Sequence, residues 1–518
     1  MARYQKTCQF DRICPSVFFY DFNKPRCLLI FQVKFVHVKR RKALKQIGWG
    51  LSGSVFLPSL LEACGSPDPG PEINYNGSVA IIGAGAAGLY VADILHSKGV
   101  NVTIFEARDQ LGGRVSSLRN QSVDKYPNKN LLSSDFPIEL GPQTIIGSNS
   151  IFGQIYKNFT LTTSEIEPAS NEFILDSTAK SDSGWAGDAD YVAAKNFRNA
   201  LKTYAGNSQT VLTEAQAVVG SRGLGMVNGM IGNLHGSSNN KIGIGALAED
   251  EVLTPTDGKV IVLRSNPMQD VLISRFSAVQ TLVKTNTPIT SVNYGGEMIT
   301  LTAKDGATYE FNKVIVTVPV SIIKSGGISF SPGLPSSYTG SLAKIGFGAS
   351  LRVFIEFKKN FWGTSTGFIY GSNNFPEYFN VGVGTGFNQS LSITVNGDKA
   401  VQYSALGEEG TINAIIADLD LIYNGQATTF VRKDVNNEKK IYVIDDWTKK
   451  EYIKGGYSYP LAGATNIDRK AIGAPVGGKL FFAGEATDIS GQAGMVNGAL
   501  ASAERCAEEV VKSILEPS

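Results

Sequence analysis

Residues 78–115 read SVAIIGAGAAGLYVADILHSKGVNVTIFEARDQLGGRV. The apolar, β-branched run at 79–82 predicts a short strand, the stretch at 89–98 predicts a helix, and residues 100–105 predict a second strand. Between the first strand and the helix, three glycines fit the pattern G-x-G-x-x-G, and an acidic residue closes the second strand about 20 residues later. This order of strand, glycine turn, helix, strand and acid predicts a dinucleotide-binding unit.

Each conspicuous residue of this stretch has a physical reason to be there. Gly83 permits the tight turn, Gly85 lets the backbone approach a pyrophosphate, and Gly88 lets the helix pack closely on the strand. The pyrophosphate would lie at the helix N-terminus, beside Ala87, because the N–H groups and the helix dipole there favour an anion. Glu106 would accept hydrogen bonds from a ribose. The stretch therefore supplies the first part of a predicted nucleotide site.

The composition indicates a globular protein with more than one domain. The chain has 518 residues, of which 42% are hydrophobic and 18% charged, and it is longer than a single core usually allows. The net charge of +2 gives no electrostatic reason to expect a nucleic-acid partner. The three histidines and five cysteines lack metal-ligand spacing, so we expect neither a metal site nor a disulfide framework.

Residues 1–77 differ from the rest and are expected to form a leader and a tether. The sequence KRRKALK at 39–45 resembles a twin-arginine export signal, and the apolar segment at 47–63 is too short and interrupted to span a bilayer. Cys64 ends a sequence that resembles a lipoprotein cleavage box, and a Gly/Pro/Ser/Asn-rich tether follows it. We therefore expect an export signal at 38–64, with translation starting near Val38. The alternative is a disordered basic N-terminus.

This leader predicts where the protein works. It indicates an exported protein of a bacterium, either periplasmic or lipid-anchored at the cell envelope. Contact with a membrane would then come only through a lipid on Cys64.

Further blocks of sequence indicate a family. They read LGGR at 111–114, IELGPQ at 138–143, VKTNTPI at 283–289 and LFFAGEATD at 480–488, followed by GQAGMVNGAL at 491–500. Together with Glu106, these blocks resemble the flavin amine oxidases, which include monoamine, polyamine and L-amino-acid oxidases. The resemblance implies FAD as the cofactor, bound by Gly83, Gly85, Ala87, Gly88, Glu106, Arg108, Gly113, Arg114, Gly141, Pro142, Gln143, Ile289, Gly484, Glu485, Met495 and Val496.

The resemblance also implies an α/β architecture, in which a Rossmann-like FAD-binding domain is interleaved with an α+β substrate-binding domain. The FAD-binding domain would consist of residues 78–143, 258–320 and 462–518, and the substrate domain of residues 144–257 and 321–461. Within the substrate domain, the glycine-rich stretch at 220–245 is expected to be a loop or a loosely packed lid. The active site would lie between the two domains, in front of the flavin.

The predicted catalytic residues are Arg352, Tyr457 and Met495. Arg352 takes the place at which the family has a lysine near flavin N5, and Lys344 could replace it only if the register slips. Tyr457 takes the place of the cysteine that monoamine oxidases bond to the flavin, so FAD should be non-covalently bound. Met495 and Ser458 stand where the family often has an aromatic pair around the amine.

These assignments imply a reaction and leave alternatives open. A small-molecule amine or L-amino acid would pass a hydride to flavin N5, the imine would hydrolyse, and oxygen would be reduced to hydrogen peroxide. No carboxylate-binding arginine can be identified from the sequence. The alternatives are a flavin-dependent C–C desaturase or porphyrinogen-type oxidase, an amine dehydrogenase with another acceptor, and a non-enzymatic flavin-binding lipoprotein.

The absence of a cysteine at position 457 gives a simple prediction. Heat or acid should release the yellow cofactor from the purified protein, because no bond ties the flavin to Tyr457. The absorbance of the supernatant after precipitation measures the release, and a yellow pellet would contradict the prediction.

Overall fold

The computed structural model describes residues 72–118, 137–436 and 438–516. The predicted export signal and Cys64 lie outside the described residues. Within the described part, none of the helices combines the length and apolar character that crossing a membrane requires.

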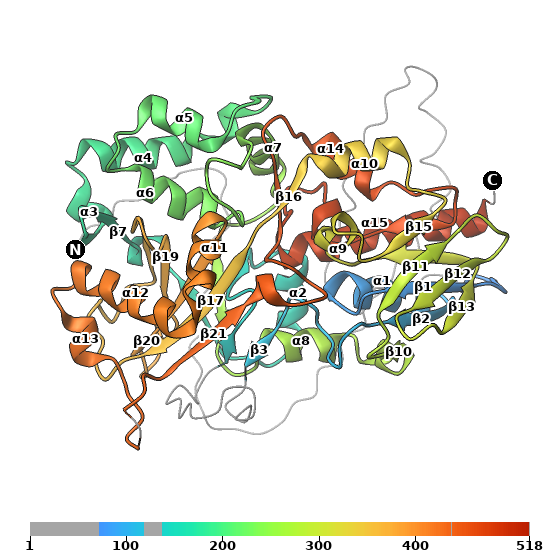
Figure 1. Cartoon of the computed structure of the whole chain (residues 1–518), viewed down its shortest axis with the longest axis horizontal. Helices are drawn as coiled ribbons and strands as arrows, with labels where there is room; N and C mark the ends of the chain where they lie inside the picture. Colours follow the sequence, from blue (N-terminus) through green and yellow to red (C-terminus); the bar gives the residue numbers. More distant parts are fainter. Residues whose placement is uncertain (1–71, 119–136, 437, 517–518) are drawn as a thin grey trace, which may run out of the picture. The chain divides into compact units, whose positions relative to one another are not determined.

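A five-stranded parallel sheet forms the centre of the nucleotide-binding part (Figure 1). Its strand order is β10-β2-β1-β14-β23. The strands are β10 (Val283–Lys284), β2 (Asn101–Phe105), β1 (Ser78–Ile82), β14 (Lys313–Val316) and β23 (Leu480–Phe482). Helix α1 (Ala86–Ser97) connects β1 to β2, as the sequence predicts. The sheet thus joins segments that are far apart in the chain.

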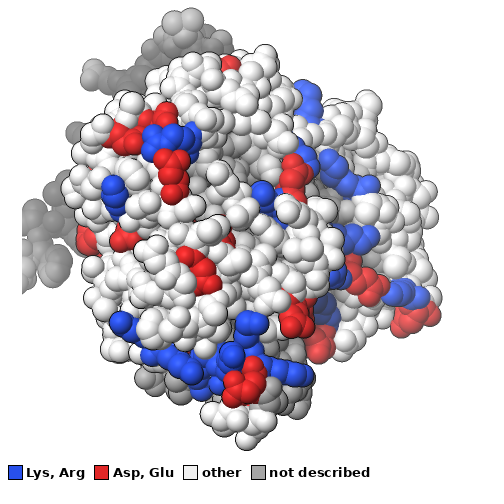
Figure 2. All heavy atoms as spheres, turned by 60° about the vertical axis from the view of Figure 1, so that its left-hand side comes forward, with Lys and Arg blue, Asp and Glu red and all other residues white. Residues whose placement is uncertain are grey.

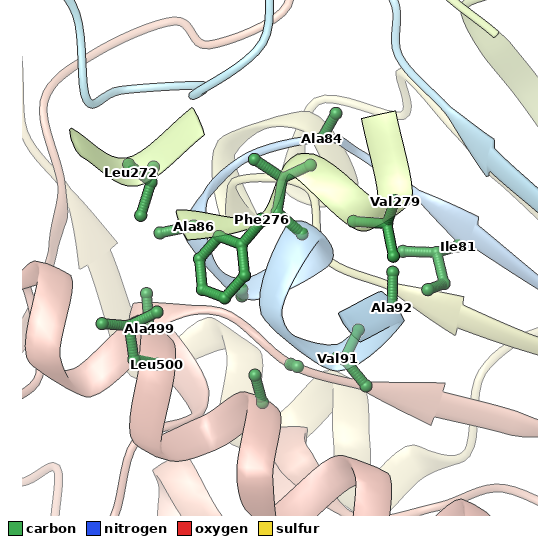
Figure 3. Packing of buried hydrophobic residues seen from close by; sticks show 14 of the residues in the cluster. Ile81, Ala84, Ala86, Val91, Ala92, Leu272, Phe276, Val279, Ala499 and Leu500 are labelled. Carbon is green, nitrogen blue, oxygen red and sulfur yellow. The ribbon is translucent and has the colours of Figure 1, made fainter. Parts of the chain in front are cut away.

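The two faces of this sheet bury different cores because side chains alternate along a strand. Val79 and Ile81 of β1 face a core built with α1, α8 (Met268–Arg275) and α15 (Val496–Leu515). Figure 3 shows Phe276, which follows α8, among residues of α1 and α15. Ala80 and Ile82 face the opposite core, so both faces of β1 are covered.

The second core is closed by a four-stranded sheet of order β13-β12-β11-β15. Its strands are β13 (Thr308–Phe311), β12 (Ile299–Ala303), β11 (Ile289–Asn293) and β15 (Ser329–Ser331). The sequence pattern suggests one strand over residues 283–289, but the structure divides this segment between two sheets. Its first residues form β10 beside β2, and Ile289 begins β11 after Pro288, which has no N–H to continue a ladder.

A seven-stranded sheet forms the rest of the molecule, in the order β21-β17-β20-β19-β18-β7-β8. Its strands are β21 (Tyr442–Asp446), β17 (Ser350–Glu356), β20 (Ser390–Asn396), β19 (Glu377–Asn380), β18 (Phe368–Tyr370), β7 (Glu172–Leu175) and β8 (Thr178–Ser181). Helix α12 (Gly407–Ile422) buries its apolar residues against β17 and β20. Both parts together confirm the predicted α/β class with a Rossmann-like unit.

The expectation of a loop or a loosely packed lid at residues 220–245 is wrong for residues 224–233, whereas residues 234–241 do lie in turns and irregular backbone. The segment contains α6 (Leu224–Val227) and a π-helical turn (Asn228–Asn233), and Met226 and Ile231 are fully buried. Its glycines allow close packing: a Cβ on Gly225 would lie 2.5 Å from the carbonyl oxygen of Gly371. The same residue type that suggested a loop here permits a tightly packed helix.

Surface charge is mixed on the face seen in Figure 2. Acidic and basic groups lie next to each other at several places, with lysines and arginines more frequent toward the lower edge of the view. Among the ion pairs of the described residues, Arg222 contacts Asp176, Asp188 and Asp190 at distances of 2.7–3.2 Å. Most of this face is uncharged, as expected from a chain with 18% charged residues.

The contact between α1 and β1 gives the next prediction. A Cβ on Gly88 would lie 1.9 Å from the carbonyl oxygen of Gly83, so Gly88→Ala must move the helix off the strand. We expect a loss of about 2 kcal/mol or more in the free energy of unfolding, together with weaker FAD binding. Denaturant unfolding and flavin retention measure the two effects.

Gly340→Ala is the matched control. Gly340 also lies in a helix, α10 (Ser336–Ala343), but a Cβ there meets no atom within 4 Å. This variant should be neutral or more stable by about 0.5–1 kcal/mol. Equal stabilities of the two variants would contradict the packing argument.

Candidate active site

One cavity of about 610 Å³ brings together nearly all of the predicted site residues. This volume is typical of a small-molecule or cofactor site. Gly88 does not line the cavity, because it packs beneath the turn at Gly83. The predicted residues that do line it are Gly83, Gly85, Ala87, Glu106, Arg108, Gly113, Arg114, Gly141, Pro142, Gln143, Ile289, Arg352, Tyr457, Gly484, Glu485, Met495 and Val496.

The turn between β1 and α1 presents backbone to this cavity. Gly83 has φ +110°, a conformation that side chains rarely adopt. Helix α1 begins after Gly85, and its first N–H groups, at Ala86 and Ala87, lie where a helix leaves its donors unpaired. A Cβ on Gly85 would meet only Gly113 Cα, at a van der Waals distance of 3.8 Å, so it would project into the cavity without a clash. This arrangement suits a pyrophosphate.

Glu106 is held in one orientation beside this turn. Its carboxylate accepts hydrogen bonds from the backbone N–H of Ala84 (2.8 Å) and of Arg108 (3.0 Å). The Arg108 guanidinium donates to the carbonyl oxygen of Gly113 at 2.8 Å. Each carboxylate oxygen of Glu106 thus keeps a lone pair that a ribose hydroxyl could use.

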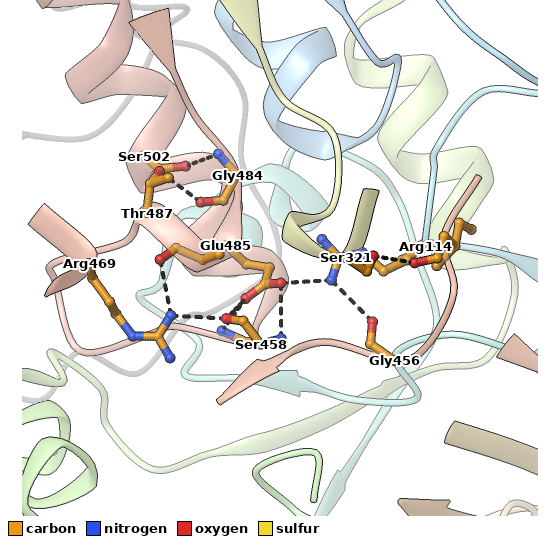
Figure 4. A network of polar contacts seen from close by, with 12 residues as sticks. Arg114, Ser321, Gly456, Ser458, Arg469, Gly484, Glu485, Thr487 and Ser502 are labelled. Atoms are coloured by element: carbon orange, nitrogen blue, oxygen red, sulfur yellow. Dashed lines mark hydrogen bonds and ion pairs between the residues drawn. The ribbon is translucent and has the colours of Figure 1, made fainter. Parts of the chain in front are cut away.

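A buried carboxylate, Glu485, connects three segments of the chain (Figure 4). Its Oε1 accepts from Arg114 Nη1 at 2.7 Å and from the backbone N–H of Ser458 at 3.2 Å. Its Oε2 accepts from Ser458 Oγ at 2.6 Å and from the backbone N–H of Gly494 at 3.0 Å. Arg114 also donates to the carbonyl oxygen of Gly456 at 3.1 Å.

These four hydrogen bonds fill the acceptor capacity of the Glu485 carboxylate. Burial alone would raise the pKa of Glu485, but the charge of Arg114 and the hydrogen bonds from Ser458 and Arg114 outweigh it and hold the pKa below its usual value. The carboxylate is therefore ionised. That Glu485 serves the cofactor stays a prediction; in the structure Glu485 lines the cavity and holds Arg114 and the Gly494 backbone, which line it too.

The opposite wall of the cavity is built by strand register. Arg352 on β17 lies directly beside Thr394 on β20, and Thr394 lies beside Glu377 on β19. All three line the cavity. The Arg352 guanidinium donates to Thr394 Oγ1 and, at 2.9 Å, to the carbonyl oxygen of Gly141. Gln143 also donates to Thr394 Oγ1, at 3.3 Å.

Burial shifts the pKa values of two residues of this wall, Glu377 and Arg352. It raises the pKa of Glu377, although Arg352 and Thr394 partly oppose the shift, and it lowers the pKa of Arg352. Lys344, the alternative to Arg352, forms an ion pair with Asp468 at 3.2 Å, and its side chain is 52% exposed. Lys344 does not line the cavity, so the basic group at this position is Arg352.

Aromatic side chains form the remaining wall. The Tyr457 hydroxyl donates to the carbonyl oxygen of Leu234 at 2.7 Å, and its ring lies beside Gly494. Ser458 turns its hydroxyl to Glu485, so Tyr457 is the aromatic residue that this segment contributes to the cavity. Phe368 and Tyr370 of β18 add two more rings, and Met495 lines the cavity from the start of α15.

Comparison with known proteins identifies the family. Residues 247–511 match the family described as flavin containing amine oxidoreductase, and residues 81–159 match an NAD(P)-binding Rossmann-like domain. The chain belongs to the flavin-containing amine oxidoreductase family. This membership confirms the resemblance found in the sequence and the prediction of a flavin cofactor.

Relatives and solved structures show how widely the fold is shared. Human lysine-specific histone demethylase 2 is 24% identical over 442 residues, which cover 81% of this chain and 51% of the relative. The chain thus spans about half the length of this demethylase. Polyamine oxidase 4 of Oryza sativa subsp. japonica is 24% identical over 494 residues, covering 90% and 93% of the two chains.

Two oxidase structures share the fold of this oxidoreductase. A putrescine oxidase superimposes with a TM-score of 0.69 at 19% identity, covering 84% of this chain and 99% of the other. Cyclohexylamine oxidase from Brevibacterium oxydans IH-35A gives a TM-score of 0.68 at 17% identity, covering 85% and 100%.

The residues present fit FAD. Open space at Gly85 and the N-terminus of α1 suit the pyrophosphate, and Glu106 suits a ribose. A Cβ on Gly484 would meet nothing nearer than 3.7 Å, so this second glycine also leaves room on the cavity side. The N-terminus of α15, at Val496, provides a further set of helix donors along the cavity.

The sequence reasoning missed Glu377, Thr394, Phe368 and Tyr370. One signal was available: Glu377 is a single carboxylate within the otherwise uncharged run FPEYFN at 375–380. A charge in a strand of buried residues needs a partner or a function. The other three residues are ordinary members of strands, and only the sheet register brings them to the site.

The Glu485 network predicts a defined pH dependence. Because the folded pKa of Glu485 is lowered, its contribution to stability is complete above the unfolded pKa of about 4.3 and is lost as the pH falls through the folded pKa. Glu485→Gln should therefore cost about 2 kcal/mol near pH 7, because Arg114 loses its partner, and the cost should shrink in acid.

Denaturant unfolding of both proteins from pH 7 downward measures this difference. Glu165→Gln is the control, because Glu165 pairs with Lys259 at an exposed site and should change little. A cost of Glu485→Gln that grows in acid would contradict the assignment.

Proposed function

We propose that this protein oxidises the CH–NH group of a small-molecule amine and uses oxygen as the electron acceptor. In the overall reaction, the amine, water and oxygen give a carbonyl compound, ammonia or a smaller amine, and hydrogen peroxide. When bound, FAD supplies the electron-pair acceptor for the C–H bond beside the nitrogen and passes the electrons to oxygen. Family membership and the names of the relatives, which include a polyamine oxidase and a putrescine oxidase, support this proposal.

The row of Arg352, Thr394 and Glu377 is the reason why we propose an amine, and not an amino acid, as the substrate. A substrate carboxylate needs a guanidinium fork that is free to bind it. Both Nη atoms of Arg352 already donate, to Thr394 and to Gly141, while its buried Nε has no partner among the described residues. Glu377 places a carboxyl group on the same wall. The wall therefore attracts a cationic amine and disfavours an anionic group.

The walls also prepare the amine for reaction. Tyr457, Phe368 and Tyr370 surround it with apolar surface, which disfavours the ammonium form by desolvation. The raised pKa of Glu377 makes its carboxylate a suitable acceptor for the proton that the amine must lose. In its neutral form the amine can give up the electron pair of the C–H bond beside its nitrogen, which the ammonium form cannot.

Anaerobic mixing of the FAD-loaded protein with candidate substrates tests this proposal. The panel contains monoamines, diamines, N-alkylated amines and L-amino acids, and the visible absorbance of oxidised flavin is followed. We expect bleaching by amines, and recovery with peroxide formation when air enters. Bleaching that air does not reverse would indicate a dehydrogenase with another acceptor. Bleaching by L-amino acids alone, or by no member of the panel, would overturn the proposal.

Glu377→Gln should raise KM more for diamines than for monoamines, because diamines carry more positive charge. The variant keeps the shape of the side chain but loses the charge, so we expect KM for diamines to rise about tenfold, corresponding to about 1.4 kcal/mol, and KM for monoamines to rise less. Steady-state kinetics with both substrate classes measures the effect, and Glu165→Gln serves as an exposed control. Equal changes for both classes would argue against Glu377 as a determinant of specificity.

A further inference from the structure

A second, much smaller cavity lies directly behind the aromatic wall. Its volume is about 20 Å³, and it shares Leu234, Tyr457, Gly494 and Met495 with the large cavity. On its other side it is lined by polar residues from three separate segments: His235, Asp250 and Arg469.

Three buried polar atoms of these residues lack a hydrogen-bond partner within the described protein. They are His235 Nε2, Asp250 Oδ1 and Arg469 Nε. Asp250 is 7% exposed and Arg469 is 2% exposed. An unpaired buried polar atom destabilises the folded protein, so three of them around one cavity require an explanation.

The donors and acceptors of the three atoms match one water molecule. Burial, together with the charges of Arg198 and Arg469, lowers the pKa of His235 to about 3, so its imidazole is neutral and can accept at Nε2. Asp250 Oδ1 is a second acceptor, and the Nε–H of Arg469 is a donor. A water molecule donates two hydrogen bonds and accepts up to two, so one donor and two acceptors around it can all be satisfied. A polar cavity of this size also holds about one water.

We propose that this cavity is a binding site for one ordered water molecule, which accepts from Arg469 and donates to Asp250 and His235. Through this water, Asp250 and His235 act as positioning residues for Arg469. The inference goes beyond the proposed function, because it concerns the support of the cofactor site and holds for any substrate.

The network beyond Arg469 shows what the water supports. Arg469 Nη1 donates to Ser458 Oγ at 2.9 Å and to the carbonyl oxygen of Ala486 at 3.1 Å (Figure 4). Because Ser458 Oγ accepts from Arg469, its own hydrogen is directed to Glu485, 2.6 Å away. Glu485 in turn fixes Arg114 and the Gly494 backbone on the FAD side. A chain of hydrogen bonds thus runs from the water to the cofactor cavity.

A crystal structure of the unmodified, FAD-loaded protein tests the water directly. We expect one water within about 3.2 Å of all three atoms. An empty cavity, or direct hydrogen bonds among the three side chains, would overturn the proposal. Because no variant is involved, this result does not depend on how a substitution folds.

Variants of Asp250 test the consequence for the cofactor. Asp250→Asn keeps an acceptor oxygen, whereas Asp250→Leu has similar volume and none. We expect FAD to dissociate from the holoenzyme about tenfold more readily in Asp250→Leu, and within about twofold of the unmodified protein in Asp250→Asn. Flavin fluorescence after dilution of the holoenzyme measures the release.

Asp418→Asn is the control for a purely structural effect. Asp418 is also buried, but it bonds to Ser372 and Tyr378, and none of these residues lines either cavity. The Asp418→Asn variant should have a lower Tm but unchanged FAD release. Unchanged FAD release in Asp250→Leu would overturn the positioning role. No amine enters these experiments, so their outcome is independent of whether the proposed oxidation is correct.

Discussion

The arrangement of the site depends on one constraint, the burial of the Glu485 carboxylate. A buried charge is tolerated only when it is paired and its acceptor positions are filled. Here the donors come from Arg114, Ser458 and Gly494, which belong to three different parts of the chain. If any of these segments moved, a charge would remain buried without compensation. The electrostatic requirement therefore fixes the segments relative to one another.

The discontinuous chain path has a related physical origin. Neighbouring parallel strands need long crossover connections, so the chain must leave the sheet between strands. Between β2 and β10, and again between β14 and β23, it leaves for long enough to build the seven-stranded sheet. The residues that line the cavity come from within these excursions as well as from the glycine turn. This chain path brings the backbone of the glycine turn and side chains of the seven-stranded sheet to the same cavity.

The sequence predicted those features whose signals are contiguous. The unit β1-α1-β2 follows from the glycine turn and the apolar runs within one short stretch, and α15 follows from its amphipathic pattern. The wall formed by Arg352, Thr394 and Glu377 did not follow, because strand register is a property of distant pairing. Similarly, glycines at 225 and 229 suggested a loop, whereas they allow a helix to approach residues 371–376.

The difference between contiguous signals and distant pairing also explains why the sequence identified Arg352 but not its hydrogen-bond partners. The family resemblance identified the residue, but nothing in the sequence indicates that its Nη atoms donate to Thr394 and to the Gly141 carbonyl. Those two bonds immobilise a planar group whose charge is permanent. With Glu377 one strand beyond Thr394, a guanidinium and a carboxyl group stand on the same wall at fixed positions. The Arg352 guanidinium then acts as part of the wall, and under the amine oxidation proposed above the carboxylate of Glu377 is the group that would meet a cationic substrate.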